Sequence, residues 1–165
     1  MGEKIAKGFI TSADLITALR TSNWLKEVKH DANYELIYQV FTDFCPNRGK
    51  GHNTKEMDAL VVENLTINDC KDVILKGIEI IDSKQDLHHN IRLAEYTRYV
   101  DFLYIAVPDI VDIIEFAESI RRPEWGIMTI ERSGSVRVIR EPSYLHPTCR
   151  EEMLTNVVKE FASLV

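Results

Sequence analysis

Long apolar runs are missing from this chain of 165 residues, and no secretory leader is expected. No apolar stretch approaches the roughly 20 residues that span a bilayer, so no contact with a membrane is expected. The opening residues, MGEKIAKGFITSAD, hold no apolar core followed by a small-residue cleavage site, so no export signal is predicted. The sequence therefore favours a cytoplasmic protein.

The chain also has few cysteines and no excess of basic charge. Its three cysteines, Cys45, Cys70 and Cys149, are widely spaced and odd in number, so they predict neither a disulfide framework nor a paired zinc site. The formal net charge of −6 excludes a basic footprint over the whole surface. Any contact with a nucleic acid must therefore come from a local patch.

The composition that is present is that of a folded protein. Hydrophobic residues make up 45% of the chain and charged residues 28%, which is typical of a soluble globular domain. The length suits one domain with a substantial core. We therefore predict a single domain over residues 1–165, with helices at both termini.

Hydrophobic periodicity predicts alternating groups of strands and helices. The expected strands cover residues 34–42, 57–62, 73–81, 100–107, 125–131 and 135–140, the last two forming a hairpin. Helices are expected to begin at Ser12, near Leu87, at Pro108 and at Thr148. A further short helix is expected over residues 23–29. Residues 43–56 have the composition of a loop. This order favours an α/β fold with a central mixed sheet flanked by helices.

Two acidic residues stand inside apolar strand segments, namely Asp58 in MDALVV and Glu79 in GIEII. Burying a carboxylate is costly unless it is paired or binds a metal. Two carboxylates on neighbouring strands could share a hard cation such as Mg²⁺, which prefers oxygen ligands. The alternative is that each carboxylate lies on a solvent-facing side of its strand, or accepts hydrogen bonds from a loop.

The spacing of these acids resembles a nuclease signature. Asp58, a spacer of about twenty residues and an acidic-x-Lys segment are similar to the PD-(D/E)xK pattern. Residues 79–108, EIIDSKQDLHHNIRLAEYTRYVDFLYIAVP, resemble a segment of the MmcB-like DNA-repair nucleases. The residues from Trp125 to Arg140 resemble the closing segment of the same family. The resemblance covers residues 34–141.

The resemblance implies a restriction-endonuclease-like fold and a role for individual residues. Asp58, Glu79 and the backbone carbonyl of Ile80 would hold Mg²⁺ or Mn²⁺. The metal would activate a water for hydrolysis of a DNA phosphodiester bond. The auxiliary positions that the resemblance implies are Gln39 on the first strand, Asp86 in the turn and Tyr96 on the helix.

The sequence departs from the family pattern at the catalytic lysine, because Ile81 stands in that position. The nearest lysine is Lys84, which a bulge or the following turn could swing back to position the water or offset phosphate charge. A second alternative uses Asp82-Ser83-Lys84 as the literal triplet, with Asp82 replacing Glu79. In a third, the chain has no catalytic activity.

Three functional hypotheses follow. The first is a metal-dependent DNA nuclease, in repair or defence, with Asp58, Glu79 and Lys84 as catalytic residues. The second is a catalytically degenerate relative that binds DNA or a protein partner. The third is an unrelated α/β domain with two surface carboxylates. A homodimer is left open, because the apolar stripe of residues 110–120 could be core or interface.

Overall fold

The computed structural model of the chain describes residues 11–21, 38–46, 56–63, 73–89, 92–120, 122–131 and 133–163. The predicted helix within 23–29 lies outside these residues. So do the first four residues of the predicted strand 34–42 and most of the predicted loop 43–56.

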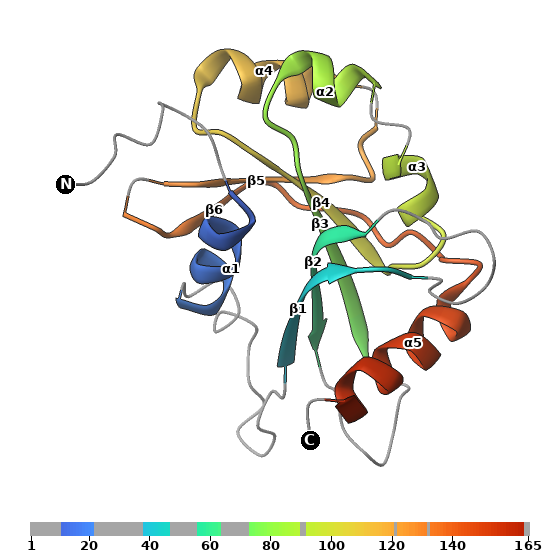
Figure 1. The fold of residues 1–165 in the computed structure, drawn as a ribbon. Helices are drawn as coiled ribbons and strands as arrows, with labels where there is room; N and C mark the ends of the chain where they lie inside the picture. Colours follow the sequence, from blue (N-terminus) through green and yellow to red (C-terminus); the bar gives the residue numbers. More distant parts are fainter. Residues whose placement is uncertain are drawn as a thin grey trace, which may run out of the picture.

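Six strands in the described part of the chain form one mixed sheet, in the order β1-β2-β3-β4-β5-β6 (Figure 1). The strands are β1 (Tyr38–Phe44), β2 (Met57–Glu63), β3 (Ile74–Ile80), β4 (Phe102–Val107), β5 (Gly126–Ile130) and β6 (Val136–Arg140). β1, β2 and β3 form an antiparallel meander, β4 and β5 run parallel to β3, and β6 returns antiparallel. The predicted hairpin at the end of the sheet is confirmed.

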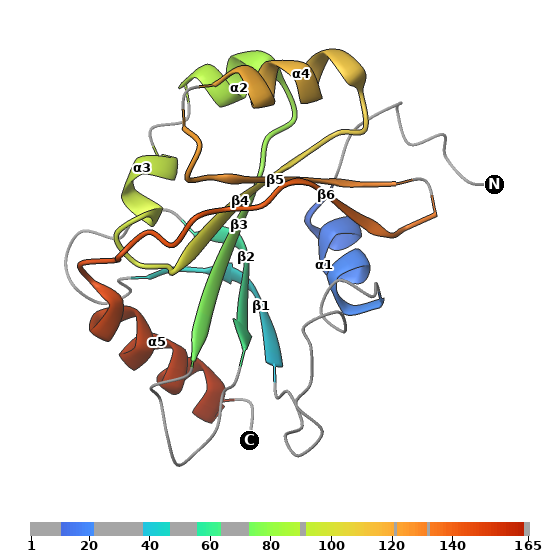
Figure 2. The ribbon, with the colours of Figure 1, turned by 180° about the vertical axis from the view of Figure 1, so that it is seen from behind.

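Helices cover both faces of this sheet. α1 (Ser12–Thr21) packs on one face through contacts with β1 and β2. The other face carries α2 (Lys84–His89), α3 (Arg92–Tyr96), α4 (Val111–Ser119) and α5 (Arg150–Ser163). Figures 1 and 2 show α1 and α5 on opposite sides of the strands. The predicted α/β fold with a central mixed sheet flanked by helices is confirmed.

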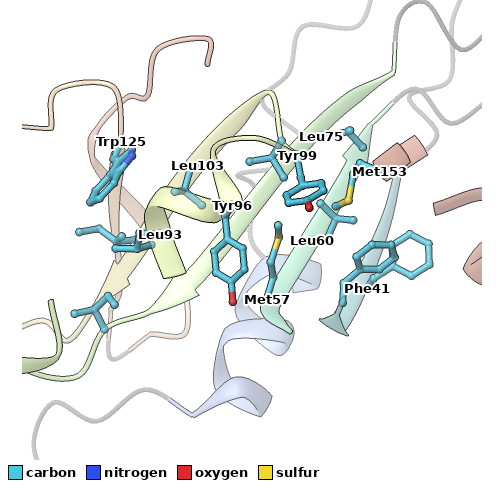
Figure 3. Packing of buried hydrophobic residues seen from close by; sticks show 14 of the residues in the cluster. Phe41, Met57, Leu60, Leu75, Leu93, Tyr96, Tyr99, Leu103, Trp125 and Met153 are labelled. Carbon is cyan, nitrogen blue, oxygen red and sulfur yellow. The ribbon is translucent and has the colours of Figure 1, made fainter. Parts of the chain in front are cut away.

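The hydrophobic core is divided by the sheet because strand side chains alternate between its faces. In β2, Leu60 and Val62 belong to the cluster beneath α2 to α5, whereas Ala59 and Val61 belong to the cluster beneath α1. The larger cluster includes residues far apart in the sequence, several of which are drawn in Figure 3: Leu60, Leu75, Leu93, Tyr96, Leu103, Trp125 and Met153. Burial on both faces explains why the central strands are almost continuously apolar.

The two later helices begin slightly downstream of their predicted starts. Pro108 does not open α4, because Ile110 is still extended (φ −126°, ψ 122°) and the helix starts at Val111. The Ile110 N–H instead donates to the Pro108 carbonyl at 2.7 Å, which makes a tight turn before the helix. α5 begins at Arg150, two residues after Thr148.

Gly126 is required for close packing between β4 and β5. A Cβ at this position would lie 2.7 Å and 2.9 Å from two ring carbons of Tyr104, its partner in the parallel register. We therefore expect Gly126→Ala to lower the free energy of unfolding by about 2 kcal/mol, as overpacked substitutions do. Chemical denaturation would measure the loss. Gly134→Asn is the control, because the space there is open and asparagine tolerates its φ of +84°. Equal stability of the two variants would contradict the prediction.

Candidate functional site

Asp58 and Glu79 lie opposite each other on adjacent strands. β2 and β3 are antiparallel with Ala59 opposite Ile78, and one further step in this register brings Asp58 opposite Glu79. Strand alternation places both on the face that carries α2 to α5, since Asp58 precedes Leu60 by two residues and Glu79 follows Gly77 by two. Both residues therefore lie on one face of the sheet, at the end where β3 leads into α2.

The two acids are also linked through the backbone. The N–H of Ile80 donates to Oδ2 of Asp58 at 2.8 Å, and the N–H of Asp58 donates to Oε2 of Glu79 at 3.3 Å. Glu79 is only 4% exposed, whereas Asp58 is half-buried. Backbone donors offset part of the cost of burying these carboxylates and fix the ends of both strands. The alternative of two solvent-facing carboxylates does not describe Glu79.

Ile81 is part of the hydrophobic core. It is 0% exposed and belongs to the cluster beneath α2 to α5. Its N–H donates to the Ala106 carbonyl at 2.9 Å, which continues the pairing of β3 with β4 by one residue. Strand alternation puts its side chain on the same face as Glu79. The position at which the resemblance calls for a lysine is therefore filled by apolar packing.

Lys84 lies at the first residue of α2 and its side chain contacts α4. The ammonium nitrogen lies 5.8 Å from the ring centroid of Phe116, within the range of a cation–π interaction. α2 and α4 pack side by side at this end of the molecule, and Figure 1 shows both beyond the ends of β3 and β4. This contact places the Lys84 ammonium beside Phe116 of α4.

Asp82 and Asp86 frame the turn between β3 and α2. Partial burial raises the pKa of Asp82, and the negative charge of Asp86 raises it further. The N–H of Asp86 donates to the Ser83 hydroxyl at 3.1 Å, which closes the first turn of α2. Both aspartates thus belong to the turn that follows the carboxylate pair, and the contacts of Asp86 are local.

Tyr96 lies in the core next to the start of β2. Its ring is fully buried and lies beside Met57, as Figure 3 shows. Its hydroxyl donates to the carbonyl of Glu56 at 3.1 Å, two residues before Asp58. The backbone of Gln39 lies in β1 opposite Val62, and its side chain is outside the described residues. Tyr96 therefore supports the strand that carries Asp58.

Asp101 is another buried carboxylate, which the sequence alone marks only as the residue before an apolar strand. It accepts two hydrogen bonds from the guanidinium of Arg150, at 2.8 Å and 3.3 Å, and one from the N–H of Leu75 at 2.8 Å. Arg150 also donates to the carbonyl of Val73. These bonds join β3, β4 and α5. An aspartate directly before an apolar strand is the signal that marks this residue in the sequence.

The oxygen donors of the carboxylate pair suit a hard cation. Asp58 and Glu79 supply carboxylate oxygens, and the resemblance adds the carbonyl of Ile80. One oxygen of each carboxylate already accepts a backbone N–H. In the described ranges, no three side chains of His, Cys, Asp or Glu come together as a metal site. The residues present thus fit Mg²⁺ or Mn²⁺ in chemical type, with two side-chain ligands.

The described helices include none with the length and apolar character needed to cross a membrane. Cys149 is a free thiol, Cys45 is buried, and Cys70 lies outside the described residues.

Comparison with known proteins supports the fold and leaves function open. No family model and no curated protein matches the chain. Among solved structures, the chain is similar to the SPO1766 protein of unknown function from Silicibacter pomeroyi, with a TM-score of 0.52 and 19% identity. The match covers 76% of this chain and 75% of that protein. At this identity the likeness concerns the fold alone.

Proposed function

We propose that this protein is a DNA-binding member of the nuclease-like folds that does not itself cleave DNA. The observation that carries the proposal is Ile81, a fully buried core residue in the position of the catalytic lysine. An isoleucine neither orients a water nor offsets phosphate charge. The proposal includes a cytoplasmic location and a role in DNA repair or defence.

The position of Lys84 supports the same conclusion. Its ammonium group lies over Phe116 of α4, so the nearest lysine in the sequence makes a structural contact between two helices. Asp58 and Glu79 each accept a backbone N–H group at the ends of β2 and β3. The fold thus keeps the two acidic residues of the nuclease pattern, but it has no lysine at position 81 to complete that pattern.

The second candidate is a metal-dependent DNA nuclease, and the adjacency of Asp58 and Glu79 favours it. Their oxygens, with the Ile80 carbonyl, would hold Mg²⁺ or Mn²⁺, which would activate a water and stabilise the phosphate in the transition state. Because Asp58 and Glu79 lie near the ends of β2 and β3, these two strands would fix the position of the ion. This candidate requires that hydrolysis proceed without a lysine at position 81.

One assay separates the two candidates. We expect the purified protein to bind DNA but to leave supercoiled and single-stranded DNA uncut in the presence of Mg²⁺ or Mn²⁺. Asp58→Ala should behave like the unmodified chain in the cleavage assay. Asp112→Ala, which removes an exposed carboxylate from α4, is the matched control for charge.

Metal-dependent cleavage that is lost in Asp58→Ala and retained in Asp112→Ala would overturn the first proposal and establish the nuclease. Absence of both cleavage and DNA binding would overturn both candidates. That result would favour the remaining hypothesis, in which the chain is an unrelated α/β domain with another role.

A further inference from the structure

An aromatic cluster lies on the surface at the start of β4, away from the carboxylate pair. The ring of Tyr144 contacts Phe102, with ring centroids 5.9 Å apart, and contacts His146 edge-to-face at 4.5 Å. Tyr144 is 46% exposed and is one of the few large apolar side chains on the described surface. We refer to Phe102, Tyr144 and His146 as the Tyr144 face.

The backbone that carries this face is held in place. The N–H of Ser143 donates to the Glu124 carbonyl at 3.0 Å, and the N–H of Leu145 donates to the Asp101 carbonyl at 2.9 Å. Leu145 also packs against the larger core cluster. Tyr144 and His146 are exposed, whereas Leu145 between them is half-buried and packs toward the core. The two exposed rings therefore have a fixed position.

The backbone at His146 has an uncommon conformation. Its φ is +51°, the left-handed region that a residue with a Cβ rarely adopts. A strained residue of this kind persists where the surrounding structure holds it, and such residues cluster at ligand sites. Here the strain accompanies the contact between the imidazole and Tyr144.

We propose that the Tyr144 face is a stacking site for an unpaired nucleobase of single-stranded DNA. The choice of DNA rests on the proposed function above. Stacking of a base on an aromatic ring is tolerant of sequence and depends on ring area. It is therefore compatible with a protein whose net charge is −6. The bases of a duplex are already stacked on each other, so this site favours single strands.

A cation lies at the end of the same segment. The N–H of Cys149 donates to the Arg98 carbonyl at 2.8 Å, and Nη2 of the exposed Arg98 lies 3.5 Å from Sγ of Cys149. An exposed guanidinium can contact a backbone phosphate of a bound strand. Residues 144–149 thus carry an exposed ring at one end and contact an exposed guanidinium at the other.

The test compares binding of a short fluorescent oligothymidine with binding of the corresponding duplex, by anisotropy at low salt, for the full chain and its variants. We expect the single strand to bind more tightly than the duplex. Tyr144→Ala should weaken single-strand binding by about tenfold, as loss of one stacked base does. Tyr144→Phe keeps the ring and should remain within about twofold of the unmodified protein.

Two further variants separate stacking from loss of structure or of apolar surface. Tyr144→Leu keeps apolar bulk without a ring face, so it should bind as weakly as Tyr144→Ala. Val158→Ala removes an exposed apolar side chain from α5 and should bind like the unmodified protein. Thermal unfolding of every variant checks that the fold is retained, and Tyr144→Phe remains informative if the smaller side chains unfold.

The outcomes also separate this inference from the proposed function. DNA binding that is equal in Tyr144→Ala, Tyr144→Leu and the unmodified chain would overturn the stacking site and leave the DNA-binding proposal standing. A preference for duplex DNA would do the same. Failure of the unmodified protein to bind any DNA would overturn both.

Discussion

Arg150→Ala is expected to lower the free energy of unfolding by about 3 kcal/mol, the lower end of the range for breaking a buried ion pair. Arg150 is 25% exposed in its side chain, whereas Asp101 is only 4% exposed. The substitution leaves the Asp101 carboxylate away from water without its guanidinium partner. The cost therefore comes mainly from the uncompensated charge.

The effect is large because the pair joins segments that are distant in the sequence. Asp101 lies directly before β4, Arg150 begins α5, and the N–H of Leu75 in β3 donates to the same carboxylate. The Leu145 N–H also bonds the Asp101 carbonyl, so the segment leading to α5 is held at the same point. Loss of Arg150 therefore loosens α5 from the sheet.

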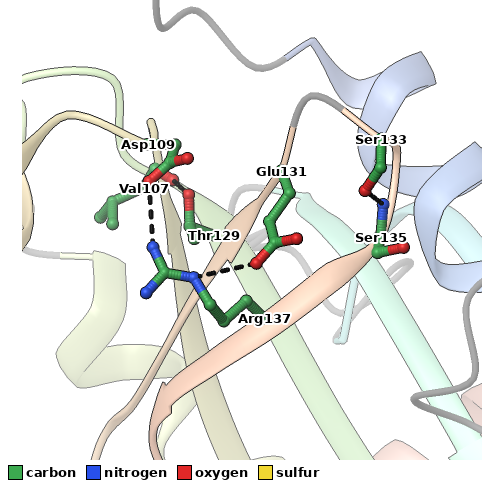
Figure 4. Close-up of polar contacts among 7 residues, drawn as sticks. All are labelled: Val107, Asp109, Thr129, Glu131, Ser133, Ser135 and Arg137. Atoms are coloured by element: carbon green, nitrogen blue, oxygen red, sulfur yellow. Dashed lines mark hydrogen bonds and ion pairs between the residues drawn. The ribbon is translucent and has the colours of Figure 1, made fainter.

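Differential scanning calorimetry measures this prediction. A loss of about 3 kcal/mol corresponds to a decrease of roughly 6–12 °C in the unfolding temperature of a chain of this size. The control is Arg137→Ala. Arg137 is 47% exposed and bridges Asp109 at 3.0 Å and Glu131 at 3.2 Å (Figure 4). Exposed pairs contribute less than about 1 kcal/mol, so equal losses for the two variants would contradict the distinction drawn here.

Ile81→Lys is expected to destabilise the protein by about 4 kcal/mol and to create no cleavage activity. Buried lysines show pKa values lowered by 3 units or more, and ~3 units correspond to about 4 kcal/mol against the charged form. Ile81 is 0% exposed within an apolar cluster, so its replacement brings an ammonium group into that environment. Lost apolar packing adds to the cost.

Urea denaturation and the cleavage assay together measure this prediction. Ile81→Leu is the matched control, since it conserves volume and should cost less than about 1.5 kcal/mol. A small loss for Ile81→Lys, accompanied by Mg²⁺-dependent cleavage, would contradict the expectation. That outcome would mean that the new ammonium reaches Asp58 and Glu79, and that the lysine is the only part missing from a nuclease site.

Much of the fold could be predicted because it depends on local patterns. The alternation of apolar residues places β2 and β3, and the Arg132-Ser133-Gly134 segment predicts the turn between β5 and β6. The start of α4 was placed too early, at Pro108. Proline is favoured at a first helical position, but here the turn that includes Ile110 delays the helix to Val111.

The candidate site was predictable only in part. Asp58 and Glu79 could be paired from the sequence because each lies near the end of an adjacent antiparallel strand. The direction of the Lys84 side chain could not be predicted, because it depends on Phe116 of α4, which lies 32 residues downstream. The burial of Ile81 likewise depends on helices that arrive later in the chain.

By itself the sequence determined the α/β class, the order of most elements and the absence of a lysine at position 81. These follow from periodicity and residue type, which act over a few neighbouring residues. Only the tertiary structure decided that Ile81 is core and that Lys84 packs on α4. It also decided that Asp101 pairs with Arg150 across 49 residues. Such contacts depend on how distant elements pack, and no local pattern in the chain encodes that packing.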